Sequence, residues 1–549
     1  MQNRIHLNAF DLTIFAAYMV VTVALGFLVS RRGRGSAKAY FLGGRTLPWY
    51  VVATSMVAAD VSSEHFIANA GAGYRYGLVA AAGSWNSWII YSLLIWIFLP
   101  YYVRTGLYTV PQFLERRYHV ACRYIFSGAL LVGYVAGIIA GALYAGGVTL
   151  HNMLGFLIED RWHVPVDHQV YIGIVFFGVV TGTYTIYGGL KSAAWTDFMQ
   201  IIVLAAGGVL VPVLGMIKAG GVVKIAHDLP YKFQVFLPAT HEKLPFTGIL
   251  TGFLTVGIWY SCTSQHMVQR VLAAKDEYHA RMGVVGAGFL HIVTPFFFAF
   301  PGLIAAKLLP DLRNPDESYL TLVQLLIPAG VRGLILAGMA AALMSNLSSV
   351  LNSAATLLTI DFYKKLIRPA ATDREEVVFG QVSGAVVLAL GMLIAWHFTR
   401  QHQPLFVLVQ NIFFYIAPPF AVIFTFGILW RRATTEAALT TIVTGFAFTA
   451  FIDHRYPAIA YLHRAFLAWC FCVVMMFAVS WGTPAPAPEK TDGVIWSPRY
   501  AALPAEERRK YSGLKDFRIW WMLFVGIVLS IYAFFVWWRL KYPVKMLPW

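Results

Sequence analysis

Cysteine and charge are both scarce in this chain of 549 residues. Its four cysteines lie in or beside apolar segments, at Cys122, Cys262, Cys470 and Cys472. Their spacing is not that of metal ligands, so the sequence argues against a disulfide framework and against a structural zinc site. Charged residues make up only 12% of the chain, far below the usual share in a soluble protein.

Long polar segments are lacking as well. The longest loops cover residues 218–245, 308–330 and 482–518, and each is too short to bury a core of its own. We therefore expect residues 1–549 to form a single domain, with the loop at 482–518 on the cytoplasmic side.

Long hydrophobic runs are what the chain has instead. Hydrophobic residues make up 58% of it, and about fourteen apolar segments are long enough to span a bilayer. The first segment ends in the basic stretch RRGRG rather than a small-residue cleavage site, so we interpret it as a retained helix and not a signal peptide. The sequence predicts an all-α polytopic membrane protein with these spans: 9–30, 48–71, 78–102, 123–153, 168–188, 193–217, 246–268, 282–307, 331–361, 377–399, 404–430, 434–452, 461–481 and 519–538.

The formal net charge of +16 has two explanations. A nucleic acid or anionic lipid partner is one, and the tendency of cytoplasmic loops to collect Lys and Arg is the other. An N-terminus outside the cell places most of the 42 Lys and Arg in cytoplasmic loops. We therefore expect a multi-pass protein of the cell membrane, in contact with lipid and not with nucleic acid. Because the number of spans is even, both termini are predicted outside.

Two spans carry polar interruptions at comparable places in the chain. In 48–71 the stretch VAADVSSEHF places Asp60, Glu64 and His65 at membrane depth. In 246–268 the stretch TVGIWYSCTSQ likewise interrupts the apolar span with polar residues. Broken helices in corresponding halves indicate the central site of a transporter, because non-helical backbone inside a membrane is tolerated only around a cavity or ligand. The alternative is that both stretches are ordinary polar patches packed between helices.

Charged and hydroxyl groups within the spans suggest a cation. Asp60 and Glu64 share a helix face, where a bound cation would relieve their repulsion, although Glu64 alone could be a protonated structural carboxyl. Hydroxyl and amide oxygens also suit an alkali cation, whereas an imidazole or thiolate set for a transition metal is lacking. Alternatively, the hydroxyls bond back to their own helix. One helix face of 339–365 carries these oxygens at steps of four and three: Ser345, Ser349, Asn352, Thr356 and Thr359.

Single polar residues occur in three other spans. Asp197 follows the Gly-Gly turn of IYGGLKSAAWTDFMQ, where it either takes part in a site or lies at the membrane interface. His291 and Gln410 each stand alone in apolar surroundings, where either one could simply form an interhelical hydrogen bond.

Four motifs together resemble the sodium:solute symporter family, and most closely its sodium/glucose and sodium/galactose branch. They are FLGGRTLPWYVVATSM, IYGGLKSAAWTDFMQ, QHMVQRVLAAK and ALMSNLSSVLNSAATLLTIDFY. The resemblance implies a leucine-transporter-like core of two inverted five-helix repeats over 48–430. It also implies a leading helix at 9–30, trailing helices over 434–538 and sodium-driven alternating access.

The resemblance further implies a main sodium site, with Asp60 close to the ion. Position 346 usually carries a hydroxyl in the family, and here an Asn carbonyl would take its place. The implied ligands are the backbone carbonyls of Ala58, Val61 and Ala342 and the side chains of Ser345 and Asn346. Relatives that couple two sodium ions imply a second site at Asp197, Ser345, Ser348 and Ser349.

Residues implied for the solute match the sugar branch only in part. His65, Tyr260 as the gate tyrosine, and Gln410 fall where that branch has them. Ser84 stands in place of a sugar-binding Glu, and His291 in place of a Lys. These five residues are the predicted solute site.

The leading hypothesis is therefore a sodium-coupled symporter, not an enzyme, that imports a small polar solute such as a sugar or polyol. An amino acid, favoured by Asp60, or a carboxylate is the alternative within the same family. A polytopic membrane acyltransferase using His291 is a remote alternative from another class. Against an anionic solute, the third core span carries no Lys or Arg beyond Arg123 at its edge.

Overall fold

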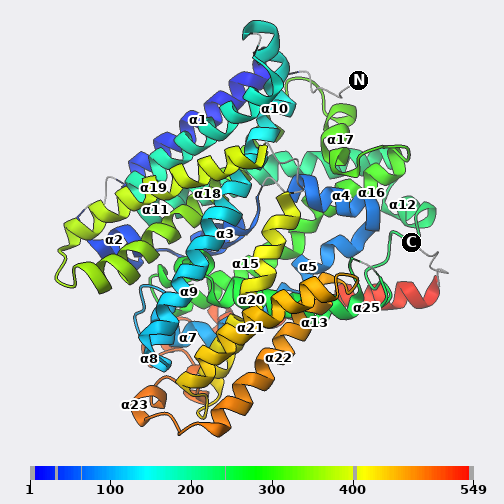
Figure 1. Cartoon of the computed structure of the whole chain (residues 1–549). Helices are drawn as coiled ribbons and strands as arrows, with labels where there is room; N and C mark the ends of the chain where they lie inside the picture. The colour runs from blue at the N-terminus through cyan, green and yellow to red at the C-terminus, as the bar shows by residue number, and fades with distance from the viewer. Residues whose placement is uncertain are drawn as a thin grey trace.

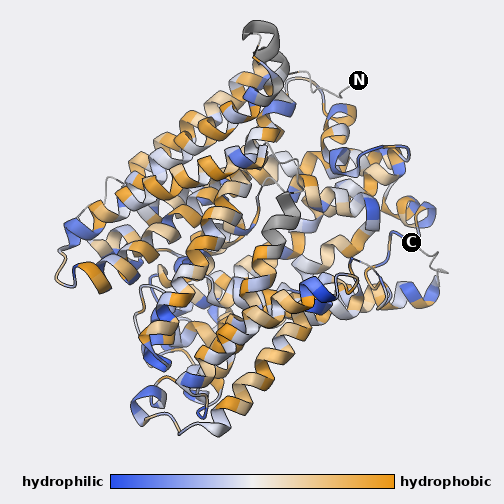
Figure 2. Cartoon of the chain, in the orientation of Figure 1, coloured by the Kyte–Doolittle hydropathy of each residue, from blue (hydrophilic) through white to orange (hydrophobic). Residues whose placement is uncertain are grey.

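A computed structural model describes residues 7–30, 35–62, 65–162, 164–241, 243–399 and 405–542. Over these ranges the chain is almost entirely helical, and its β-structure is one isolated parallel bridge between Leu47 and Ala274 (Figure 1). The predicted all-α architecture is therefore confirmed. Apolar residues run along the helices, and hydrophilic ones gather at the helix ends and in the loops (Figure 2).

The helices of the first half follow one another with short connections. They are α1 (Ala9–Ser30), α2 (Ala37–Leu42), α3 (Trp49–Asp60), α4 (Ala70–Tyr76), α5 (Ala82–Trp85), α6 (Ser87–Leu93), α7 (Leu99–Arg104), α8 (Pro111–Arg117), α9 (Val120–Val132), α10 (Ala140–Trp162), α11 (Val166–Ala219) and α12 (Val222–Asp228).

The second half contains the remaining helices. They are α13 (Phe246–Gly257), α14 (Gln265–Leu272), α15 (Glu277–Phe297), α16 (Ala299–Leu308), α17 (Ser318–Leu326), α18 (Arg332–Leu357), α19 (Asp373–Thr399), α20 (Leu405–Leu429), α21 (Thr435–Arg455), α22 (Tyr461–Gly482), α23 (Pro488–Thr491), α24 (Ala505–Lys510) and α25 (Phe517–Lys541). Wider π-helical segments join several of these helices: η2 (His65–Asn69), η4 (Leu94–Phe98), η5 (Gly133–Ile139), η6 (Ile258–Thr263) and η8 (Leu358–Ile367).

Twelve helical stretches among the described residues are long and apolar enough to cross a membrane, against the fourteen spans predicted. The difference arises at His168–Ala219, which takes in two predicted spans, and at His65–Arg104, which takes in 78–102 and only the end of 48–71. At a rise of about 1.5 Å per residue, the 52 residues of the second stretch would measure roughly 78 Å, more than twice the hydrocarbon thickness of a bilayer. This stretch therefore accounts for two crossings.

A turn at Gly189 divides that long stretch, where the sequence has its Gly-Gly pair. Gly189 has φ 61° and ψ −161°, a conformation outside the range of helical residues and open to glycine. A Cβ atom at Gly189 would also lie 2.5 Å from the carbonyl oxygen of Tyr40. The predicted Gly-Gly turn is thus confirmed at this residue.

The first predicted interruption separates α3 from α4. Helix α3 ends at Asp60, and Val61 is extended with φ −78° and ψ 124°. Residues Ser63 and Glu64 lie outside the described part of the chain, and helix resumes in η2 at His65. The hypothesis that Glu64 shares a cation with Asp60 therefore stays a prediction.

The second interruption falls at Ser264. Helix α13 continues through η6 as far as Thr263, and Ser264 then takes the extended values φ −72° and ψ 133° before α14 begins. The break lies inside the stretch TVGIWYSCTSQ that the sequence identifies. Both predicted interruptions are therefore present.

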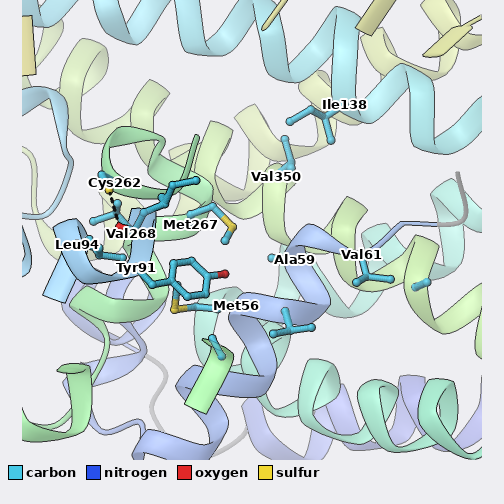
Figure 3. Close-up of a cluster of buried hydrophobic side chains, with 14 of the residues drawn as sticks. Met56, Ala59, Val61, Tyr91, Leu94, Ile138, Cys262, Met267, Val268 and Val350 are labelled. Carbon is cyan, nitrogen blue, oxygen red and sulfur yellow. Dashed lines mark hydrogen bonds between the residues drawn. The ribbon is translucent and has the colours of Figure 1, made fainter. Parts of the chain in front are cut away.

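Helix α18 is the centre around which the other elements pack. In its most apolar 18-residue window 94% of the residues are buried, and the helix contacts α1, α3, α10, α11 and α19. Side chains of Met56, Ala59 and Val61 around the end of α3 belong to the same hydrophobic core, together with Val350 of α18 (Figure 3). A helix buried on all sides has no lipid-facing stripe, so its polar residues must find partners within the protein.

The connection between α22 and α25 crosses the ends of several spans. The Trp496 backbone N–H donates to the Ile428 carbonyl at 2.8 Å, which fixes the loop to the end of α20. Arg281 of α15 donates to the Tyr500 carbonyl at 2.5 Å, and the Glu507 carboxylate accepts from backbone N–H groups at the start of α15. The long loop is thus packed against the membrane helices.

Candidate functional site

Ser345 brings together three of the oxygens predicted for the main sodium site. Its hydroxyl lies 2.8 Å from the Ala58 carbonyl at the end of α3 and 3.0 Å from the Ala342 carbonyl of its own helix. The hydroxyl has one hydrogen and two acceptors within reach, so the three oxygens form a small, electron-rich cluster. The cluster exists because α3 ends here and α18 packs directly against that end.

Asn346 adds a buried oxygen to the same region. Its side-chain Nδ2 donates to the Ala59 carbonyl at 2.6 Å, which directs the amide toward the same helix end. Its Oδ1 is buried and has no hydrogen-bond partner among the described residues. A buried carbonyl oxygen without a donor is costly unless a ligand binds it, and a hard cation such as sodium suits an amide oxygen.

Asp60 points elsewhere. Its side chain is 27% exposed, and its Oδ2 lies 3.8 Å from Nε2 of His291 on α15. Both ring nitrogens of His291 are buried without a hydrogen-bond partner in the described part of the chain. Tyr91 packs edge-on against the same imidazole, with ring centroids 5.5 Å apart. The carboxylate and the imidazole thus face each other across a gap too long for a direct hydrogen bond.

The other residues predicted for the solute lie on separate elements. His65 stands at the start of η2, where its Nδ1 accepts from the Ser62 backbone N–H at 3.1 Å. Ser84 is half-buried in α5, which packs against α15, the helix of His291. Tyr260 lies in η6, with its ring 5.9 Å from that of Phe413. Gln410 belongs to α20, and its side chain lies outside the described part of the chain.

The hydroxyl stripe on α18 is satisfied largely within its own helix. Ser349 donates to the Ser345 carbonyl at 2.6 Å and Ser348 to the same carbonyl at 3.0 Å. Thr356 and Thr359 likewise donate to carbonyls one turn earlier. The sequence left this alternative open, and it holds for most of the stripe. Ser345 differs, because its hydroxyl can donate to a carbonyl of another helix, that of Ala58 on α3.

Asp197 is fully buried inside the protein. Its Oδ2 accepts from the Ser55 hydroxyl at 2.6 Å and lies 3.6 Å from the Arg270 guanidinium, which is itself fully buried. Arg270 also donates to the Ser349 hydroxyl. Asp197 Oδ1 has no hydrogen-bond partner among the described residues. Two members of the predicted second sodium site thus meet around a guanidinium.

Arg270 is the buried residue near the predicted sites that the sequence reasoning missed. It stands in QHMVQRVLAAK, a motif used only for the resemblance. An arginine at membrane depth is expensive and is almost always paired with an acid, so this Arg could have been matched with Asp197. A second sodium ion at Asp197 would share that carboxylate with Arg270, and the second site stays a prediction.

A model of the sodium:solute symporter family matches residues 40–445 of the chain. A sodium/glucose cotransporter of Vibrio parahaemolyticus is 32% identical over 508 residues, which covers 87% of this chain and 91% of the relative. A sodium/myo-inositol cotransporter of Mus musculus is 30% identical over 493 residues, with coverage of 81% and 67%.

Solved structures agree on the fold. A Na+-coupled sialic acid symporter in an outward-open, substrate-bound state matches with a TM-score of 0.76 at 21% identity, covering 87% of this chain and 99% of the other. The nucleobase-cation-symport transporter Mhp1 in a closed conformation matches with a TM-score of 0.52 at 15% identity, covering 82% and 97%. At these identities the structures support the fold alone, and they confirm the predicted leucine-transporter-like architecture.

Proposed function

The chain belongs to the sodium:solute symporter family, and from this premise we propose that it imports a sugar or polyol together with sodium. The names of the glucose and myo-inositol cotransporters support a neutral, hydroxyl-rich solute. The same relatives are cotransporters, so the acyltransferase alternative is dropped.

The observation that carries the sodium assignment is Asn346 Oδ1, which is buried on the residue after Ser345 and has no hydrogen-bond partner among the described residues. A sodium ion there would be held by the carbonyls of Ala58, Val61 and Ala342 and by the side chains of Ser345 and Asn346. The positive charge of the ion would offset the partial negative charges of these oxygens, which have too few hydrogens among them to bond one another. It would also hold the end of α3 against α18, so that sodium binding is linked to the arrangement of the first interrupted helix.

For the solute, the gap between Asp60 and His291 favours a neutral hydroxyl group. A hydroxyl placed between them can bond the carboxylate and the imidazole at once, since it is both donor and acceptor. His65, Ser84, Tyr260 and Gln410 complete the proposed solute site.

A carboxylate solute fits this arrangement poorly. It would meet the Asp60 carboxylate, and two buried cations of the core are already engaged. Arg123 donates to Asp361 at 2.6 Å, and Arg270 faces Asp197. The solute is therefore proposed to carry no negative charge.

Location and orientation belong to the same proposal. The family and the apolar helices make this a multi-pass membrane protein. We place it in the cell membrane with both termini outside, because that orientation leaves the Lys-rich and Arg-rich loops in the cytoplasm.

An uptake screen tests the proposed function. Purified protein in liposomes is given labelled hexoses, myo-inositol, proline or sialate, under an inward sodium gradient or an equal potassium gradient. We expect sodium-dependent uptake of a hexose or of myo-inositol. Sodium-dependent uptake of proline or sialate alone would reject the solute class, and uptake that ignores sodium would reject the coupling.

A further inference from the structure

The second interrupted helix is bound at its break by a residue from a distant part of the chain. Helix α14 begins at Gln265, and the Ser264 side chain makes no hydrogen bond that caps it. The first backbone N–H groups of a helix need acceptors from outside the helix. Here the Tyr134 hydroxyl of η5, 132 positions away in sequence, accepts from the His266 N–H at 3.0 Å.

Three buried side chains form one polar cluster at this point. The Tyr134 hydroxyl lies 2.8 Å from Ser264 Oγ, and Ser264 Oγ lies 2.8 Å from His266 Nδ1. Each of the three residues is at most 1% exposed. We refer to Tyr134, Ser264 and His266 as the break cluster.

The donors and acceptors of the break cluster determine which ring nitrogen of His266 carries the hydrogen. Both hydroxyl hydrogens of the break cluster find an acceptor inside it only when His266 Nδ1 accepts. The neutral ring then carries its hydrogen on Nε2, and Nε2 has no partner among the described residues. The two hydroxyls and Nδ1 are thereby satisfied within the break cluster while Tyr134 and α14 stay in contact.

The break cluster also contacts the candidate gate. The His266 ring packs edge-on against Tyr260, with centroids 4.9 Å apart. All eight residues of α14 are buried, so the side chains of this helix are shielded from solvent in the present arrangement. Alternating access requires one group of helices to move against another, and the break cluster joins α14 to a helix of the other half of the chain.

We propose that Tyr134, Ser264 and His266 hold α14 and Tyr260 in the closed arrangement, and that separation of Tyr134 from α14 accompanies opening of the solute path. This inference rests on the proposed transport function. In it His266 is a positioning residue, because it acts through Tyr260 and the start of α14.

Thiol labelling of α14 tests the inference. Met267 on α14 is buried, and Met267→Cys in a chain whose native cysteines are replaced by Ser supplies one reporter thiol. Tyr134→Phe removes only the hydroxyl. We expect the labelling rate by a small thiol reagent in liposomes to rise about two- to tenfold, the range for one lost hydrogen bond.

Matched variants distinguish a specific effect of the break cluster on α14 from a general loss of stability. Tyr118→Phe removes another buried tyrosine hydroxyl, which donates to the Ile423 carbonyl at 2.9 Å, and it should leave the rate unchanged. Ser264→Ala and His266→Leu should raise the rate as Tyr134→Phe does. His266→Asn keeps an acceptor near the Nδ1 position and should restore the parent rate.

Two outcomes would overturn the inference: an unchanged labelling rate in Tyr134→Phe, Ser264→Ala and His266→Leu, or an equal rise in Tyr118→Phe. The labelling assay needs no solute. An absence of sodium-driven uptake in the same liposomes would therefore reject the proposed function, while the labelling pattern would still decide the role of the break cluster.

Discussion

The hydroxyl of Ser345 lies 2.8 Å from the carbonyl oxygen of Ala58, across a separation of 287 residues in sequence. One atom belongs to the central helix α18 and the other to the end of the interrupted helix α3. A cation bound between them would stabilise this contact and resist any motion that separates the two helices. The contact therefore offers a physical link between sodium binding and the conformational state of the protein.

Asp60 tests the electrostatic part of the sodium site. Asp60→Asn keeps the shape of the side chain and removes its charge. We expect the sodium concentration for half-maximal uptake to rise by less than about fivefold, since two unit charges 4 Å apart interact by about 1 kcal/mol in bulk water and the Asp60 carboxylate faces His291 rather than the ion. Sodium activation curves of uptake in liposomes provide the measurement. A variant that fails to insert into the membrane would instead make Asp60 a structural acid.

The second sodium site predicts the transport stoichiometry. Each additional sodium ion moved inward contributes about 2.3 kcal/mol per 100 mV, so accumulation of solute becomes steeper in voltage. We expect parallel sodium and solute fluxes in liposomes to give two ions per solute, and Asp197→Asn to lower the ratio to one. Asp11→Asn, at another fully buried acid, is the control. A ratio of one in the parent protein would remove the second site.

The buried pair of Asp197 and Arg270 makes a separate prediction about stability. Arg270→Met leaves the Asp197 carboxylate buried without its cation, at a cost of about 3–5 kcal/mol. The double variant Arg270→Met, Asp197→Asn removes both charges and should recover much of that loss. Thermal unfolding in detergent measures Arg270→Met, Asp197→Asn and the double variant. Strictly additive losses would show that the two charges do not interact.

His291 tests the proposed solute contact. His291→Leu fills a similar volume and removes both ring nitrogens, so a bridging solute hydroxyl loses one partner. We expect solute binding to weaken about tenfold or more, in the range for a buried polar group left unpaired. Equilibrium binding of the solute identified by the uptake screen measures this effect, and sodium binding without solute serves as the control. Unchanged solute affinity would place the solute elsewhere.

The sequence predicts most of the fold, because long apolar segments and two polar interruptions are local signals. The breaks near Asp60 and Ser264 were predictable from polar residues in otherwise apolar spans. The sequence predicted that the hydroxyls of α18 share one helix face. It could not predict that most of them donate to carbonyls of their own helix, because the same spacing suits both a ligand and those carbonyls.

Contacts between distant segments could not be predicted from local patterns. The partner of Arg270 lies on another helix, and the interaction of Tyr134 with the start of α14 depends on a backbone break that only the folded chain defines. Spacing along the sequence carries no information about which helices touch. The resemblance therefore identified candidate residues, and the structure showed which of them contact one another.

Sodium activation of uptake by Ser345→Ala tests the central claim most directly. The substitution removes the hydroxyl at the junction of α3 and α18, whereas Ser383→Ala removes a buried hydroxyl that bonds only to its own helix. We expect Ser345→Ala to raise the sodium concentration for half-maximal uptake by about tenfold or more, as for a lost bond to a charged group, and Ser383→Ala to leave it unchanged. An identical sodium activation curve for Ser345→Ala and the parent protein would contradict the account.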